Sequence, residues 1–273
     1  MRFHRAVLAL AAALLILALP VGAQAPYRIL VTNDDGVRAP GIAALARALE
    51  AVGEVHVIAP AENQSGKGHS LTLTDPVYVD PIRLPDGLTA LGVSATPASV
   101  VKVAVLALMA ERPDLVVSGI NRGLNTGTAS FVSGTVGAAR EAALQGIPAI
   151  ATSMDVKGGW NDYGLAARAT ADIAAALKAH PLAAGTFLNV NVPAGTPKGR
   201  RVVPPSVKAG IETWTEQKTP RGRRYFWNEF ALPEDDVEGT DIHAVVEGFV
   251  AITPLRLSDF DEAAAAKLAA VLR

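Results

Sequence analysis

The sequence predicts an α/β fold in which helices cover both faces of a mostly parallel sheet. Short apolar strands alternate with helical segments from residue 28 to residue 192, as they do in parallel sheets. The first such unit runs from the strand Arg28–Thr32 through the helix Pro40–Val52 to the strand Glu54–Ala59, which is the length of a parallel crossover. Half of the 273 residues are hydrophobic and 19% are charged, which excludes a disordered chain.

The alternation continues along the chain. Short strands are predicted near Leu71–Thr74, Val77–Asp80 and Leu88–Val93. Thr96-Pro97 then opens a helix that runs to about Met109, because Thr suits a helix N-cap and Pro the first helical position. The later elements are the strands Asp114–Ser118, Ala149–Ser153 and Phe187–Val192 and the helices Thr135–Gln145 and Leu165–Ala179.

The C-terminal third departs from this pattern. Residues 194–240 are rich in Pro, Gly and charge, have no helical period, and contain Trp214, Trp227 and the basic run Arg221–Arg224. They predict an extended arm or hairpin at about 205–235. A strand over Ala244–Ile252 and a helix over Asp259–Leu272 are expected to close the chain.

The N-terminus predicts a signal peptide at residues 1–23, before a single domain at 26–273. Arg2 and Arg5 precede the apolar run Ala6–Leu19, which is shorter than a membrane span of about 20 residues. Cleavage is expected after Ala23, with Ala25 as the alternative site, and an uncleaved anchor as the alternative fate. The mature protein is therefore expected to be exported, to the periplasm, without a stable membrane anchor.

Composition excludes several classes of function. The chain has no cysteine, which removes disulfides, Cys-zinc sites, iron–sulfur clusters and thiol catalysis. Lys and Arg number 25 against 26 Asp and Glu, so no global basic field points to a nucleic-acid polymer as partner. There is no GxSxG nucleophile elbow, no GxGxxG dinucleotide loop and no Walker A loop.

The candidate site lies where the parallel strands end, because ligands bind beyond their carboxyl ends. Asn33–Gly36 follows the first strand and holds two adjacent carboxylates, Asp34 and Asp35. A tight turn would explain an isolated Asp-Gly pair. Two neighbouring carboxylates at the end of a buried strand instead favour a divalent cation, which is a hard acid suited to oxygen ligands.

Two further segments suggest phosphate binding. Ser65-Gly66-Lys67 follows the second strand, and its Gly allows backbone N–H groups to approach an anion, although a flexible loop is the alternative. Ser133-Gly134-Thr135 begins a helix, where N–H groups favour phosphate, although ordinary N-capping is the alternative. His69 is a candidate general acid or supporting group, with packing as the alternative.

These segments together resemble the SurE family of stationary-phase survival proteins. The resemblance is carried by Ile29–Val37 with Ala39–Ile42, by Val57–Pro60 with Asn63–Leu73, by Asp114–Asn121 with Gly123, Asn125 and Gly127, and by Ser133–Val136. Shorter matches follow at Leu188–Pro193, Thr240-Asp241 and Ile252–Leu255. Family members often carry Asp where this chain has Ser99, and acids where it has Thr128-Ala129.

The resemblance implies a Rossmann-like SurE fold with a C-terminal arm, and hydrolysis of nucleoside 5′- and 3′-monophosphates. It implies one divalent metal ion, Mg²⁺ or Mn²⁺, and a homodimer or homotetramer assembled through the arm and the last helix. The metal ligands would be Asp34, Asp35, Ser65 and Asn121, with Asp34, Asp35 and Asn121 catalytic. The substrate-binding residues would be Ser65, Gly66, Lys67, Asn125, Ser133, Gly134 and Thr135.

Three alternatives stay open at this point. The first is a broad-specificity acid phosphatase or exopolyphosphatase. The second is a phosphate-ligand binding protein without turnover. The third is an enzyme in which Asp34 acts as a covalent nucleophile rather than as a ligand of a water-activating metal.

Overall fold

A computed structural model describes residues 25–208, 210–231 and 237–272. Its main feature is a nine-stranded sheet in the order β3-β4-β2-β1-β5-β6-β7-β11-β8, and β9 and β10 form a separate hairpin. The predicted signal peptide at 1–23 lies outside the described residues and stays a prediction. Within the described part of the chain, no helix is both long enough and apolar enough to cross a membrane.

The main elements agree closely with the sequence pattern. The strands of the sheet are β1 (Arg28–Thr32), β2 (Glu54–Pro60), β3 (Val79–Arg83), β4 (Thr89–Val93), β5 (Leu115–Arg122), β6 (Ala149–Met154), β7 (Thr186–Val192), β8 (Arg200–Val202) and β11 (Val250–Arg256). The helices are α2 (Pro40–Leu49), α3 (Pro97–Val103), α4 (Gly134–Leu144), α5 (Tyr163–Ala179), α6 (Asp241–Val246) and α7 (Glu262–Val271). A π-helical turn, Ala104–Leu108, extends α3.

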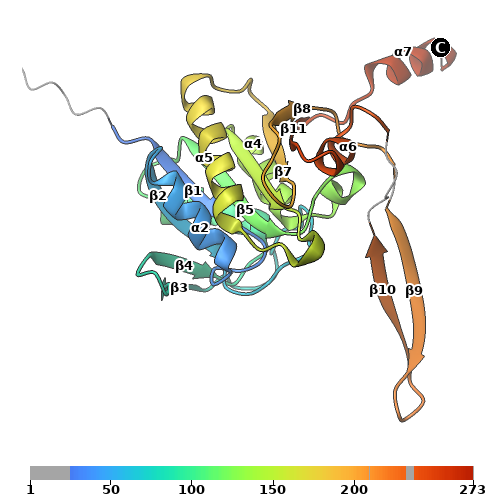
Figure 1. Ribbon diagram of the computed structural model, residues 1–273, viewed down its shortest axis with the longest axis horizontal. Coiled ribbons are helices and arrows are strands. Elements are labelled where there is room, and N and C mark those ends of the chain that lie inside the picture. Colours follow the sequence, from blue (N-terminus) through green and yellow to red (C-terminus); the bar gives the residue numbers. More distant parts are fainter. Residues whose placement is uncertain (1–24, 209, 232–236, 273) are drawn as a thin grey trace, which may run out of the picture.

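The core has two halves, one on each face of the sheet. Ile29 and Val31 of β1 pack with α2 and α5, whereas Leu30 packs with α3 and α4. This follows from the period of two along a strand, which sends successive side chains to opposite faces. Figure 1 shows α2 and α5 lying side by side over one face of the sheet. The predicted α/β fold with helices on both faces is confirmed.

The strand order fixes where a site can form. β4, β2, β1, β5, β6 and β7 are mutually parallel, while β3 and β11 run antiparallel to their neighbours β4 and β7. The chain builds outward from β1 through β2 to the edge strand β3, comes back to β4 between β3 and β2, and then crosses to the other side of β1 as β5. The point between β1 and β5 is therefore a topological switch point, where ligands bind in sheets of this kind.

Three local predictions are wrong. Leu71–Thr74 forms no strand: the Thr72 N–H donates to the Ser99 hydroxyl (2.7 Å) rather than to a neighbouring strand. The strand expected over Ala244–Ile252 begins only at Val250, because Ala244–Val246 is the end of α6. β8, in a segment expected to lie outside the core, pairs with β11 at the sheet edge.

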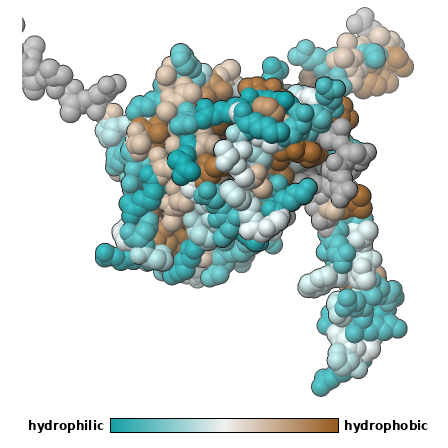
Figure 2. Space-filling view, viewed as in Figure 1, coloured by the Kyte–Doolittle hydropathy of each residue, from teal (hydrophilic) through white to brown (hydrophobic). Residues whose placement is uncertain are grey.

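The predicted arm is a two-stranded antiparallel hairpin of β9 (Ile211–Lys218) and β10 (Arg224–Ala231). It stands clear of the body, as α7 does (Figure 1), and hydrophilic residues gather toward its end in Figure 2. Trp214 and Trp227 are each more than half exposed, at 61% and 63%. Part of the expected range 205–235 lies outside the described residues.

Candidate active site

The turn after β1 is closed by Asn33. Its side-chain amide donates to the Gly36 carbonyl (2.9 Å), and its side-chain oxygen accepts from the Gly36 N–H (3.2 Å). Gly36 has a φ of 101°, which favours glycine. The turn therefore places Asp34 and Asp35 at the carboxyl end of β1, with Asp34 only 3% exposed.

Asp34 lies against the first turn of α4. The Thr135 hydroxyl donates a hydrogen bond to Asp34 Oδ1. A Cβ on Gly134 would lie 2.9 Å from Asp34 Oδ2, so only glycine fits beside this carboxylate. Ser133 is the N-cap, and its hydroxyl accepts from the Val136 N–H (3.2 Å). The helix start thus supports a negative charge at Asp34, as helix N-termini do.

Burial still dominates the electrostatics of Asp34. Desolvation raises its pKa from 3.8 to about 6, with a further upward contribution from Asp35, and the Thr135 hydrogen bond only partly opposes the rise. Desolvation likewise raises the pKa of Asp35, against the lowering influence of Arg122. The protein groups around this pair do not fully compensate its negative charge.

β5 brings Asn121 and Arg122 to the same edge of the sheet. The Arg122 N–H donates to Asp35 Oδ2 (3.1 Å), and the Asn121 side-chain amide donates to the Gly123 carbonyl (2.7 Å). The pairing of β5 with β6 shifts register between Ser118 and Asn121. Asn121 keeps its side-chain oxygen free of any hydrogen bond to the described residues.

The loop after β2 lies beside the Asp34 turn. The Gln64 N–H donates to the Asp34 carbonyl (2.7 Å), and the Gly68 N–H donates to the Val132 carbonyl (2.9 Å). Between these two anchors, Ser65, Gly66 and Lys67 are exposed. Lys67 forms no ion pair with any described residue.

The donor set fits a hard divalent cation. Two adjacent carboxylates, a hydroxyl and an amide oxygen are ligands that Mg²⁺ and Mn²⁺ accept. The buried hydroxyls of Thr32 and Ser118, on paired positions of β1 and β5, have no hydrogen-bond partner among the described residues, and such groups suit a hydrated ion. No cluster of three or more His, Cys, Asp or Glu occurs in the described ranges, so neutral oxygens must complete the set.

Asn125 lies in a buried network behind the site. Its side-chain amide donates to the Ser153 hydroxyl (2.7 Å), its N–H to Asn191 Oδ1 (2.8 Å), and its carbonyl accepts from the Asn189 side chain (2.8 Å). Asp241 extends this region by accepting from the Gly127 N–H (2.8 Å). In this structure Asn125 shapes the loop, and its direct contact with substrate stays a prediction.

The sequence reasoning missed two residues of this region. Tyr163, at the start of α5, lies close enough to the site that Asp35 adds to the upward shift that burial gives its pKa. Glu141 of α4 is 3% exposed and accepts a hydrogen bond from His69 (2.9 Å). The sequence feature that could have pointed to Glu141 is that it is the one acidic residue in the helix Gly134–Leu144, which consists mostly of small residues.

Comparisons with known proteins point in one direction. Residues 29–220 match the family described as "Survival protein SurE". Proteins called 5′-nucleotidase SurE from Geotalea daltonii and Syntrophotalea carbinolica are each 45% identical to this chain, over 236 and 231 residues. The matches cover 84% of this chain and 93% and 91% of those proteins.

The fold agrees with a solved structure of the same kind. The crystal structure of SurE protein from Aquifex aeolicus superposes with a TM-score of 0.77 at 34% identity. The superposition covers 90% of this chain and the whole of the other. The likeness therefore extends over most of this chain.

Proposed function

This chain belongs to the SurE family, and from that premise we propose that it is a metal-dependent phosphomonoesterase of nucleoside 5′- and 3′-monophosphates. The observation that best supports the proposal is that three segments lie together at the topological switch point: the turn after β1, the loop after β2 and the start of α4. The incompletely compensated carboxylate Asp34 contacts the loop after β2 and the start of α4, and the neighbouring Asp35 contacts Arg122 at the end of β5. Such a site has a place for a cation and an adjoining place for an anion.

The residues divide the work of phosphoryl transfer. Asp34, Asp35, Ser65 and Asn121 would hold one Mg²⁺ or Mn²⁺, which when bound supplies Lewis acidity toward a phosphoryl oxygen and activates a water. Thr135 keeps the Asp34 carboxylate in one orientation through its hydroxyl. Gly66, Lys67 and the amides of Ser133-Gly134-Thr135 would bind the phosphoryl oxygens, on which negative charge spreads during the reaction.

One assay tests this proposal. The purified chain is given nucleoside 5′-monophosphates, 3′-monophosphates, polyphosphate and an aryl phosphate, with Mg²⁺, Mn²⁺ or a chelator. The proposal expects phosphate release from the nucleotides that a chelator abolishes and added metal restores. Release from all substrates alike would favour a broad-specificity phosphatase, and tight nucleotide binding without release would favour a binding protein.

The stereochemical course at phosphorus separates the two chemical routes. Direct in-line attack by water inverts the configuration of an isotopically chiral phosphoryl group. Net retention of configuration would instead show two displacements through an aspartyl-phosphate at Asp34 and overturn the proposed route.

Replacing Lys67 by alanine is expected to raise KM for nucleotides, more at low salt than at high salt. The exposed ammonium attracts the anionic substrate as a point charge, and salt screens such contacts. The measurement is KM at two ionic strengths for both proteins. An exposed arginine distant from this loop, Arg83→Ala, is the control, and an unchanged KM for Lys67→Ala would assign no substrate contact to Lys67.

We also propose that the arm joins subunits into a homodimer or homotetramer. A two-stranded hairpin is marginally stable alone in water, and this one exposes Trp214, Phe226 and Trp227. Replacing 208–230 by a short Gly-Ser linker is expected to yield a monomer in light scattering. An assembly of unchanged mass would place the interface elsewhere.

Export to the periplasm, after cleavage of the signal peptide at 1–23, is the remaining part of the proposal. It is supported by the charged start, the short apolar run and the small residues before Pro26. Cell fractionation with N-terminal sequencing tests it. A start at Gln24 supports cleavage after Ala23, and a soluble cytoplasmic protein starting at Met1 contradicts export.

A further inference from the structure

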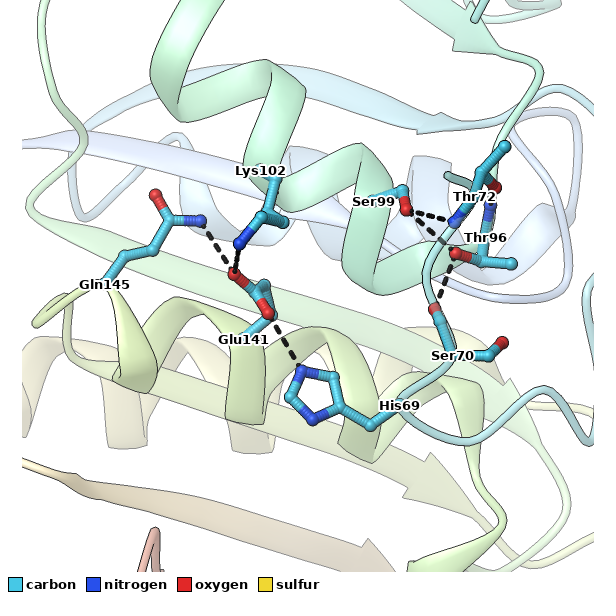
Figure 3. Close-up of polar contacts among 8 residues, drawn as sticks. All are labelled: His69, Ser70, Thr72, Thr96, Ser99, Lys102, Glu141 and Gln145. Atoms are coloured by element: carbon cyan, nitrogen blue, oxygen red, sulfur yellow. Dashed lines mark hydrogen bonds and ion pairs between the residues drawn. The ribbon is translucent and has the colours of Figure 1, made fainter. Parts of the chain in front are cut away.

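Glu141 joins three elements behind the candidate site. It lies on α4, is 3% exposed, and accepts hydrogen bonds from His69 Nε2 (2.9 Å), Lys102 Nζ (3.1 Å) and Gln145 Nε2 (3.2 Å). Figure 3 shows His69 reaching this carboxylate from the loop after β2, and Lys102 reaching it from α3. A buried carboxylate that accepts three hydrogen bonds holds the segments that donate them firmly together.

The carboxylate is ionised at neutral pH. Burial alone would raise the pKa of Glu141, but the hydrogen bonds from His69, Lys102 and Gln145 hold it below its ordinary value. An ionised carboxylate only accepts hydrogen bonds, so His69 must carry a proton on Nε2. The contact is therefore a charge-assisted hydrogen bond, the stronger kind.

The segment that contains His69 is seated closely on α4. A Cβ on Gly137 would lie 2.2 Å from the Gly68 carbonyl oxygen and 3.1 Å from the His69 Cα. Beyond His69, the Thr96 hydroxyl donates to the Ser70 carbonyl (2.7 Å), as Figure 3 also shows. The loop is thus fixed on its C-terminal side at three successive residues, Gly68, His69 and Ser70.

The exposed residues Ser65, Gly66 and Lys67 directly precede these contacts. On their other side, the Gln64 N–H is bonded to the Asp34 carbonyl (2.7 Å). No hydrogen bond holds the side chains of Ser65 or Lys67 to another described residue. Their position beside the Asp34 turn therefore depends on backbone contacts within the loop and on its two ends, and Glu141, through His69, holds one of these ends.

We propose that Glu141 is a positioning residue, which through His69 holds the loop Ser65–Lys67 in place for phosphate binding beside Asp34. The assignment of phosphate to this loop rests on the proposed function. The assignment of Glu141 as the anchor of the loop rests on the contacts alone. The two can therefore be tested separately.

Limited trypsin digestion measures how firmly the loop is held, and it needs no ligand. Lys67 is an exposed cleavage site inside the loop, and Lys178, whose ammonium donates to the Val52 carbonyl (2.7 Å), reports opening of the core helix α5. The ratio of cleavage after Lys67 to cleavage after Lys178, followed by mass spectrometry, separates loop release from global unfolding. The full chain is used throughout.

Two variants are expected to raise this ratio about tenfold, the size expected for loss of a charge-assisted hydrogen bond. They are His69→Ala, which leaves Glu141 paired with Lys102 and Gln145, and Glu141→Gln, which removes the charge. His69→Gln keeps an N–H donor at a similar reach and is expected to restore the wild-type ratio. Gln145→Ala removes a donor to Glu141 that does not belong to the loop, and is the matched control.

Kinetics then connect the loop to the site. If phosphate binds Ser65–Lys67, His69→Ala and Glu141→Gln raise KM about tenfold with a smaller change in kcat, and His69→Gln restores KM. If the wild-type protein releases no phosphate, the proposed function is wrong. The cleavage ratio after trypsin digestion then tests by itself whether Glu141 positions the loop. A wild-type cleavage ratio in both His69→Ala and Glu141→Gln, or an equal rise at Lys67 and Lys178, would overturn the anchor.

Discussion

Asp34→Asn is expected to lower turnover by about a thousandfold or more, while the metal-free protein becomes no less stable than the wild type. The substitution keeps the shape and the oxygen that accepts from Thr135, but it removes an anionic ligand from a hard-cation site. It also removes a buried charge that the surrounding groups do not compensate. Turnover is therefore expected to fall while the stability of the metal-free protein rises. A general packing defect would lower both.

The stability gain has a defined pH dependence when a chelator is present. Because the folded pKa of Asp34 is raised from 3.8 to about 6, the ionised form destabilises the native state above pH 6. That cost, on the order of 3 kcal/mol, disappears as the pH falls and Asp34 binds a proton in the native state. The gain from Asp34→Asn should therefore be largest above pH 6 and vanish near pH 4.

Steady-state kinetics with added metal measures the loss of turnover. Chemical denaturation in the presence of a chelator measures the stability of the metal-free protein. Asp80→Asn, at an exposed position of β3, is the control and should change neither. Near-wild-type turnover of folded Asp34→Asn would contradict the metal assignment. A loss of several kcal/mol in chelator would instead show that the charge of Asp34 stabilises the fold.

Gly137→Ala is expected to lower kcat/KM by about tenfold or more, although alanine is the better helix former. The new Cβ would lie 2.2 Å from the Gly68 carbonyl oxygen and 2.7 Å from the Gly68 carbonyl carbon, so backbone must move. Helix propensity gains about 1 kcal/mol, whereas overpacking costs about 1–3 kcal/mol. The loop is the part that can yield, and its movement displaces Ser65–Lys67.

Gly164→Ala in α5 is the matched control. Its Cβ would meet only the ends of two side chains, Arg168 and Asp162, each at 3.2 Å. It should therefore keep activity and gain stability. Steady-state kinetics with thermal unfolding of both variants checks the pair, and full activity in Gly137→Ala would show that the loop tolerates displacement.

The sequence predicted the sheet well because its central strands are buried on both faces and therefore mostly apolar. It misread the short pieces, where tertiary contacts override the local pattern. The alternating residues of Leu71–Thr74 resemble a strand, yet the Thr72 N–H is satisfied by Ser99 on another element. Asp241–Val246 is rich in β-branched residues, yet Asp241 accepts from the Ser206 and Gly127 N–H groups and begins a helix there.

The candidate site was predictable where residues follow a strand directly. Asp34 and Asp35 do so after β1, Asn121 lies at the carboxyl end of β5, and the rule for parallel sheets brings them to one edge. Glu141 could not be predicted in the same way, because an acid on a helix is ordinarily solvated. Only the packing of α4 against α3 and the His69 segment reveals that it is buried.

The hairpin of β9 and β10 restricts the symmetry of any assembly that it forms. An arm that reaches away from its own body makes a closed assembly when two protomers exchange arms reciprocally about a twofold axis. A one-way exchange would pass from protomer to protomer and, without ring closure, give a filament. Charged residues such as Glu216 and Arg224, which pair across the hairpin (2.6 Å), disfavour stacking of further strands along its edges. If the arm joins subunits by reciprocal exchange, as proposed, the complexes are finite and even-numbered.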